Sequence, residues 1–185
     1  QGRLAGSEGE QKAANYIQKY FKKLGLKTHL QPFEYSIKLN PHDENSSTPS
    51  KGTNVIGYLD NKASKTIVIG AHYDHLGLNQ HHQSTLMNSD GQIHNGADDN
   101  ASGVSAVMEL ARIFAKNKTQ EKVNYVFVLF SAEEDGLIGS KKFAENVKSQ
   151  YPNVVTMINM DMVGRLDKDK NLTVGGVGSS PIFPD

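Results

Sequence analysis

The sequence predicts an α/β sandwich built on a mainly parallel β-sheet. Short apolar runs of strand length alternate with helical patterns along the chain, as in parallel α/β proteins. Two of the runs, TIVIGAH (66–72) and YVFVLF (125–130), are apolar almost throughout, which is typical of strands buried on both faces. The chain has 185 residues, of which 37% are hydrophobic and 22% charged, and this fits a single globular domain over 1–185.

The first helix is predicted in the segment SEGEQKAANYIQKYFKKLGLK (7–27), and both of its ends are marked. Ser7 and Glu10 have the spacing of a capping box. Gly25 follows the last periodic residue, where a glycine commonly ends a helix. The apolar residues recur at helical spacing and form one face. They are Ala13, Ala14, Ile17, Tyr20, Phe21 and Leu24.

The remaining elements follow in alternation. Strands are predicted over 27–35, 53–60, 66–72, 125–130, 154–160 and 171–176, and helices over 101–116 and 139–149. Two polar segments without periodicity, 39–51 and 76–97, are predicted to be surface loops.

Composition excludes several classes of function. Lysine plus arginine equals aspartate plus glutamate at 20 each, so net charge gives no reason to expect a nucleic-acid partner. No apolar run reaches the roughly 18 residues of a membrane span. The chain has no cysteine, which excludes disulfides and thiolate metal sites and leaves the cellular compartment open. Seven histidines and the acidic residues remain as metal ligands.

Acidic and histidine side chains follow the predicted strands. His72 and Asp74 come after 66–72, Glu133 and Glu134 after 125–130, and Asp161 after 154–160, while Asp98 and Asp99 precede the helix 101–116. Ligands of parallel sheets bind beyond the carboxyl ends of the strands. Carboxylates gathered there would repel one another unless cations neutralise them. The sequence therefore predicts a site for one or two divalent metal ions.

The residue types suggest a division of roles. His72 offers a neutral imidazole as a ligand, and Asp74 could accept the hydrogen bond of its other ring nitrogen. Asp98 has two carboxylate oxygens and could bridge two cations. One of the pair Glu133 and Glu134 could bind a cation while its neighbour serves as a general base.

Four blocks, AHYDHLG, IHNGADDNASG, SAEEDGLIGS and INMDMVGR, together resemble the M28 family of co-catalytic zinc aminopeptidases. The beginning GRLAGSEGEQKAANYI is similar to that family as well. The resemblance implies a three-layer α/β/α sandwich, like that of zinc peptidases, with a central mixed, mainly parallel sheet. It also implies a secreted or periplasmic exopeptidase that uses Zn²⁺ to hydrolyse N-terminal residues from peptides.

The resemblance also assigns the site residues. His72 and Asp161 are expected to bind the first zinc, Glu134 the second and Asp98 both, with Glu133 as general base and Asp74 as the partner of His72. In the family a cis peptide bond often follows the bridging aspartate, so we expect the bond Asp98–Asp99 to be cis. We expect His75 to line the site without binding metal, and His81, His82 and His94 to be solvated in their loop.

One ligand of the family has no counterpart here. The family places a further histidine on the second zinc, well downstream of INMDMVGR, and no histidine follows Asp161. We therefore expect an incomplete domain, truncated at its C-terminus. Such a chain would bind one or two zinc ions, have impaired activity and be prone to self-association through exposed core surface. Two alternatives stay open: a single-zinc enzyme like glutaminyl cyclase, and a non-catalytic metal-binding domain.

Overall fold

The computed structural model describes residues 2–39 and 46–179. Within them lies a five-stranded sheet in the spatial order β1-β2-β4-β3-β5. Its strands are β1 (Lys27–Lys38), β2 (Ser47–Leu59), β3 (Thr66–His72), β4 (Asn124–Phe130) and β5 (Val154–Asn159). β2 is antiparallel to β1 and β4, whereas β3 is parallel to β4 and β5. The predicted mixed sheet is confirmed, with the parallel strands at its centre and at the β5 end.

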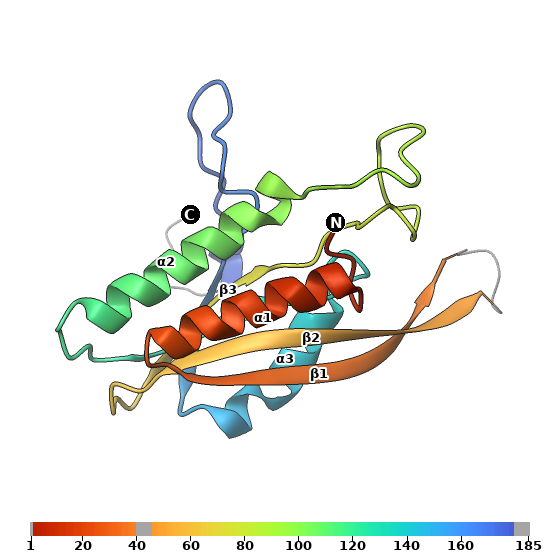
Figure 1. Ribbon diagram of the computed structural model, residues 1–185. Coiled ribbons are helices and arrows are strands. Elements are labelled where there is room, and N and C mark those ends of the chain that lie inside the picture. The colour runs from red at the N-terminus through yellow and green to blue at the C-terminus, as the bar shows by residue number, and fades with distance from the viewer. Residues whose placement is uncertain (1, 40–45, 180–185) are drawn as a thin grey trace.

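Helices cover both faces of the sheet and make the three predicted layers (Figure 1). α1 (Glu8–Lys23) and α2 (Gly103–Lys116) pack on one face, and α3 (Ile138–Gln150) packs on the other. A short π-helical turn, η1 (Ala97–Ser102), leads into α2, and a 3₁₀ turn, η2 (Val177–Ser179), lies near the end of the described residues.

Strand β4 forms the centre of the core because all of its residues are buried. On the α1 side Phe21 meets Phe127, with ring centroids 6.4 Å apart. On the α3 side Phe143 meets Phe130 at 5.7 Å. Burying an aromatic ring of this size stabilises a fold by about 1.5–3 kcal/mol. The apolar run of β4 thus reflects contact with helices on both faces.

The predicted ends of α1 are confirmed. The Ser7 side chain accepts a hydrogen bond from the Glu10 N–H, and Gly25 has a φ of 84° just beyond the helix. The Glu10 carboxylate does not accept a hydrogen bond from the N–H of the cap residue Ser7, as it would in a complete capping box. It accepts a hydrogen bond from the Gly6 N–H at 2.7 Å and one from the Ser131 hydroxyl, so it ties α1 to the end of β4.

The structure corrects one predicted loop and one predicted strand. β2 begins at Ser47, so residues 47–51 of the predicted loop 39–51 belong to a strand, and 40–45 lie outside the described residues. The predicted strand 171–176 is not formed, because no neighbouring strand pairs with this segment among the described residues. The second predicted loop has neither helix nor strand from 76 to 96. None of the described helices is long and apolar enough to cross a membrane.

Candidate metal centre

The parallel strands bring their carboxyl ends to one edge of the sheet. His72, the last residue of β3, pairs with Phe130, the last residue of β4. The Met160 N–H, just after β5, donates to the carbonyl oxygen of Gly70 at 2.9 Å. The chain segments that leave β3, β4 and β5 therefore start side by side, and their polar side chains meet as the sequence predicts.

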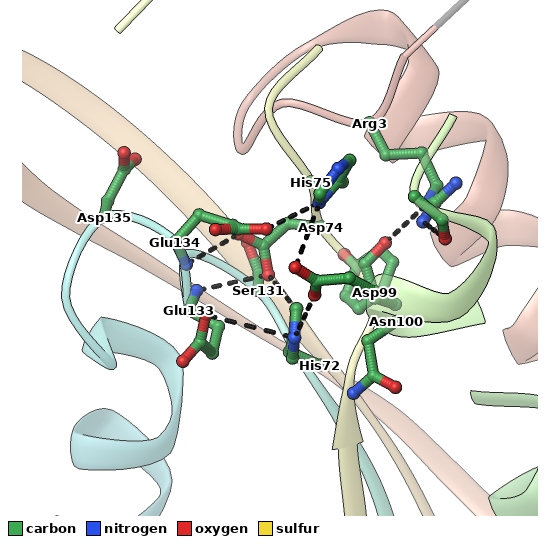
Figure 2. Close-up of polar contacts among 12 residues, drawn as sticks. Arg3, His72, Asp74, His75, Asp99, Asn100, Ser131, Glu133, Glu134 and Asp135 are labelled. Carbon is green, nitrogen blue, oxygen red and sulfur yellow. Dashed lines mark hydrogen bonds and ion pairs between the residues drawn. The ribbon is translucent and has the colours of Figure 1, made fainter. Parts of the chain in front are cut away.

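His72 lies at the centre of the group, and its side chain is only 3% exposed. Its Nε2 is 3.1 Å from Asp99 Oδ1, 3.5 Å from Asp161 Oδ1 and 3.9 Å from Glu133 Oε2. Figure 2 shows His72 below the carboxylate of Asp99, with Glu133 to one side. Three acidic side chains from three loops thus surround one imidazole nitrogen.

Asp99, and not Asp98, is the aspartate that joins this group. Asp98 Oδ1 accepts a hydrogen bond from the Gly164 N–H at 2.9 Å, and its Oδ2 lies 3.9 Å from Arg165 Nε. The side chains of neighbouring residues leave the backbone in different directions, so only one of the two can face His72. The cis bond, expected at Asp98–Asp99, is found one residue later at Asp99–Asn100.

Asp74 holds the loop that carries the two glutamates. Its two carboxylate oxygens accept hydrogen bonds from the backbone N–H groups of Glu133 and Glu134, at 3.1 and 3.3 Å. The distance from Asp74 Oδ1 to His72 Nδ1 is 3.7 Å, which is longer than a hydrogen bond. The expected partnership with His72 is therefore an electrostatic one, and the hydrogen bonds of Asp74 orient the glutamates.

A second histidine faces the other side of Asp99. His75 Nδ1 lies 2.6 Å from Glu134 Oε1 and 4.0 Å from Asp99 Oδ2. Asp99 thus presents one oxygen towards His72 and the other towards His75, as the dashed lines of Figure 2 show. The site has two halves that share this carboxylate.

The charges of the site favour a cation. Burial lowers the pKa of His72, but Asp74, Glu133 and Asp161 outweigh this effect and raise the pKa to about 9. Burial raises the pKa of Glu133, and the charges of Glu134, Asp74 and Asp161 raise it further, against the effect of His72. At both residues the neighbouring carboxylates favour the protonated form, while burial adds to this effect at Glu133 and opposes it at His72.

The side chains fit a metal ion of the zinc type. His72, Asp99 and Glu134 each offer a ligand atom, and these three atoms all lie within 4.8 Å of one another. One imidazole nitrogen and several carboxylate oxygens make a donor set that Zn²⁺ binds in proteins. The excess negative charge is what a divalent ion would neutralise.

Two structurally important residues escaped the sequence analysis. Asn100 is fully buried, and its side chain accepts hydrogen bonds from the N–H groups of Gly103 and Met162 and donates one to the Met160 carbonyl oxygen. It therefore joins the turn of Asp99 to the residues on either side of Asp161. In the sequence, Asn100 stands out only as an asparagine near the start of a helix, a position where asparagine commonly caps the helix.

Asp135 is the other, with a side chain only 1% exposed. It accepts hydrogen bonds from the Tyr35 hydroxyl and from Gln83 Nε2, and lies 2.8 Å from His81 Nδ1. The expectation that His81 is solvated is wrong, because this contact leaves its side chain 13% exposed. The same expectation is confirmed for His82, whose side chain is 66% exposed.

The chain is similar in sequence to known proteins. The family model described as Peptidase family M28 matches residues 54–184. A probable zinc metalloprotease of Phaeosphaeria nodorum is 36% identical over 135 residues, which are 69% of this chain and 27% of that protein.

Two solved structures have a similar fold. The LapA aminopeptidase of Legionella pneumophila superposes with a TM-score of 0.62 at 28% identity, over 89% of this chain and 40% of that one. The glutaminyl cyclase of Porphyromonas gingivalis superposes with a TM-score of 0.74 at 20% identity, over 88% of this chain and 56% of that one. The chain spans less than two thirds of the length of each of these proteins.

Proposed function

The chain belongs to peptidase family M28, and from this premise we propose that it carries the metal centre of a zinc-dependent aminopeptidase. The observation that supports the proposal best is the placement of Asp99, whose two oxygens face His72 and His75 on opposite sides. A carboxylate in that position suits the bridge between two metal ions, which commonly lie about 3.5–4 Å apart in hydrolytic sites.

We assign the ligands from these contacts. His72, Asp99 and Asp161 would hold one ion, because the two carboxylates lie 3.1 and 3.5 Å from the same imidazole nitrogen. Asp99 and Glu134 would hold a second, with His75 against Glu134. Bound zinc would supply a Lewis acid that polarises the scissile carbonyl and makes water more acidic.

Glu133 is the general base of this proposal. It lies beside His72 in the same acidic group, and its raised pKa favours proton transfer. Glu133 takes a proton from the attacking water as the bond from oxygen to the carbonyl carbon forms. It then gives that proton to the departing nitrogen as the peptide bond breaks. Asp74 fixes the backbone of Glu133 and so the position of its carboxylate.

The negative charge of the site suits a substrate with a free, protonated N-terminus. The proposal is tested by incubating the chain and Zn²⁺ with a Leu-terminated peptide and with the same peptide acetylated at its N-terminus. We expect release of leucine from the free peptide only, loss of this activity with a chelator, and recovery with Zn²⁺. Equal cleavage of both peptides would contradict an aminopeptidase.

A Gln-terminated peptide in the same assay distinguishes an aminopeptidase from the second candidate function, a glutaminyl cyclase. Loss of ammonia with no shortening of the peptide would indicate a glutaminyl cyclase, whose fold this chain shares. Zinc binding without either reaction would indicate a non-catalytic domain. Secretion or export to the periplasm also belongs to this proposal, and fractionation of the source cells with detection of the protein tests it.

A further inference from the structure

Arg3, in the N-terminal segment, lies next to the proposed metal centre. Arg3 donates three hydrogen bonds, all of them to backbone carbonyl oxygens: Nε to Tyr73 at 2.7 Å, Nη1 to Asn95 at 2.8 Å and Nη2 to Gly96 at 3.0 Å. Its own carbonyl oxygen accepts a hydrogen bond from the His75 N–H at 2.9 Å. Figure 2 shows Arg3 beside the loop that carries Asp99.

The segments joined by Arg3 are those that carry His72 and Asp99. Tyr73 lies between His72 and Asp74, at the end of β3. Gly96 is the residue from which η1 starts, and its carbonyl oxygen also accepts a hydrogen bond from the Ala101 N–H. Asp99 lies within that turn. The guanidinium is planar and rigid, so bonds from three of its nitrogens fix the two segments against each other.

Along the chain, a long loop joins the two segments. Residues 76–96 link the two segments without helix or strand. Two backbone hydrogen bonds close this loop upon itself: the His94 N–H donates to the Gly77 carbonyl oxygen and the Gly91 N–H to that of Leu78, both at 2.9 Å. These bonds do not join Tyr73 to Gly96, whereas the side chain of Arg3 contacts the carbonyl oxygens of both residues directly.

We propose that Arg3 is a positioning residue that sets the spacing between His72 and Asp99 by clamping the end of β3 to the start of η1. The inference rests on the proposed metal site, and it adds a residue from the N-terminal segment, outside the matched region 54–184. Arg3 does not bind the cation.

The charge and the geometry of Arg3 have opposite effects, and this makes the proposal testable. A guanidinium close to a site for divalent cations repels them, so its charge alone weakens binding. The clamp strengthens binding because it holds Asp99 in place. Removing the side chain therefore raises the affinity for zinc if charge dominates and lowers it if positioning dominates.

The experiment is a calorimetric titration of Zn²⁺ into the purified chain and into the variants Arg3→Met and Arg3→Lys. We expect both variants to lose about 10-fold or more in affinity, the usual effect of removing a group that orients metal ligands. Lysine keeps the charge but cannot reach three carbonyl oxygens in one plane. Unchanged affinity in Arg3→Lys, or tighter binding in Arg3→Met, would overturn the proposal.

The matched control is Arg112, an arginine of α2 that pairs with Glu109 at the surface. Arg112→Met and Arg112→Lys should leave the affinity for zinc unchanged. A second readout needs no metal: hydrogen exchange of the peptide covering 97–101 should be faster in Arg3→Met than in the parent chain. If the parent chain binds no zinc, the proposed function fails, and hydrogen exchange alone decides whether the clamp exists: unchanged exchange refutes it.

Discussion

His75 and Glu134 are in direct contact, with 2.6 Å between Nδ1 of the histidine and Oε1 of the glutamate. The two residues come from different loops, one after β3 and the other after β4. The contact places His75 beside Glu134 and within 4.0 Å of Asp99, on the side of the proposed metal centre that faces away from His72.

Replacing His75 by alanine should therefore weaken zinc binding. Loss of a partner that orients a metal ligand typically costs about 10–100-fold in affinity. Titration calorimetry measures the change. His82→Ala is the matched control, because His82 is exposed and its ring lies 3.3 Å from the exposed Asp90. Equal affinities for the two variants would show that His75 has no role in the site.

The neighbouring aspartates allow a direct test of which one bridges. Asp99→Asn removes the charge that faces His72 and His75, so we expect zinc binding to be lost or reduced to the limit of detection. Asp98→Asn keeps an oxygen for the Gly164 N–H and changes only a surface contact with Arg165, so we expect affinity close to that of the parent chain. The reverse result would restore Asp98 as the ligand.

Glu133→Gln tests the general base. The amide has the shape of the carboxylate but cannot take a proton from water, so we expect peptide hydrolysis to fall by about 10²–10⁴-fold. Steady-state kinetics on the Leu-terminated peptide measures the loss, and metal analysis should find the same zinc content as in the parent. Normal turnover with the variant would remove Glu133 from the mechanism.

Glu10 makes stability depend on pH. Burial raises the pKa of this carboxyl group from 4.5 to about 7 in the folded chain, so the folded state binds more protons than the unfolded state between these values. Its contribution is fully present below pH 4.5 and is lost as pH rises through about 7, with a cost of about 3 kcal/mol.

The test compares Glu10→Gln with the parent chain by urea unfolding at pH 5 and pH 8. The amide cannot ionise, so the variant should gain stability relative to the parent as the pH rises. Glu8→Gln is the control, since Glu8 lies on the same helix with its side chain 82% exposed. A difference that is the same at both pH values would show that Glu10 is not the group responsible.

The sequence by itself determined most of the helices and strands and the edge of the sheet at which the polar side chains of the site meet. An apolar run such as YVFVLF has to be buried on both faces, and parallel strands place the residues that follow them at one edge. His72, Glu133, Glu134 and Asp161 were located by this reasoning. The strand predicted over 171–176 failed because its pattern had no strand to pair with among the described residues.

Only the tertiary structure decided which carboxylate faces which partner. Asp98 and Asp99 are chemically identical neighbours, and the direction of each side chain depends on backbone angles and on contacts with Gly164 and His72. The clamp of Arg3 also lies beyond local patterns, since it joins residues 70 and 93 positions apart. Sequence periodicity records which face of an element is buried, whereas the pairing of individual polar atoms is set when distant segments pack together.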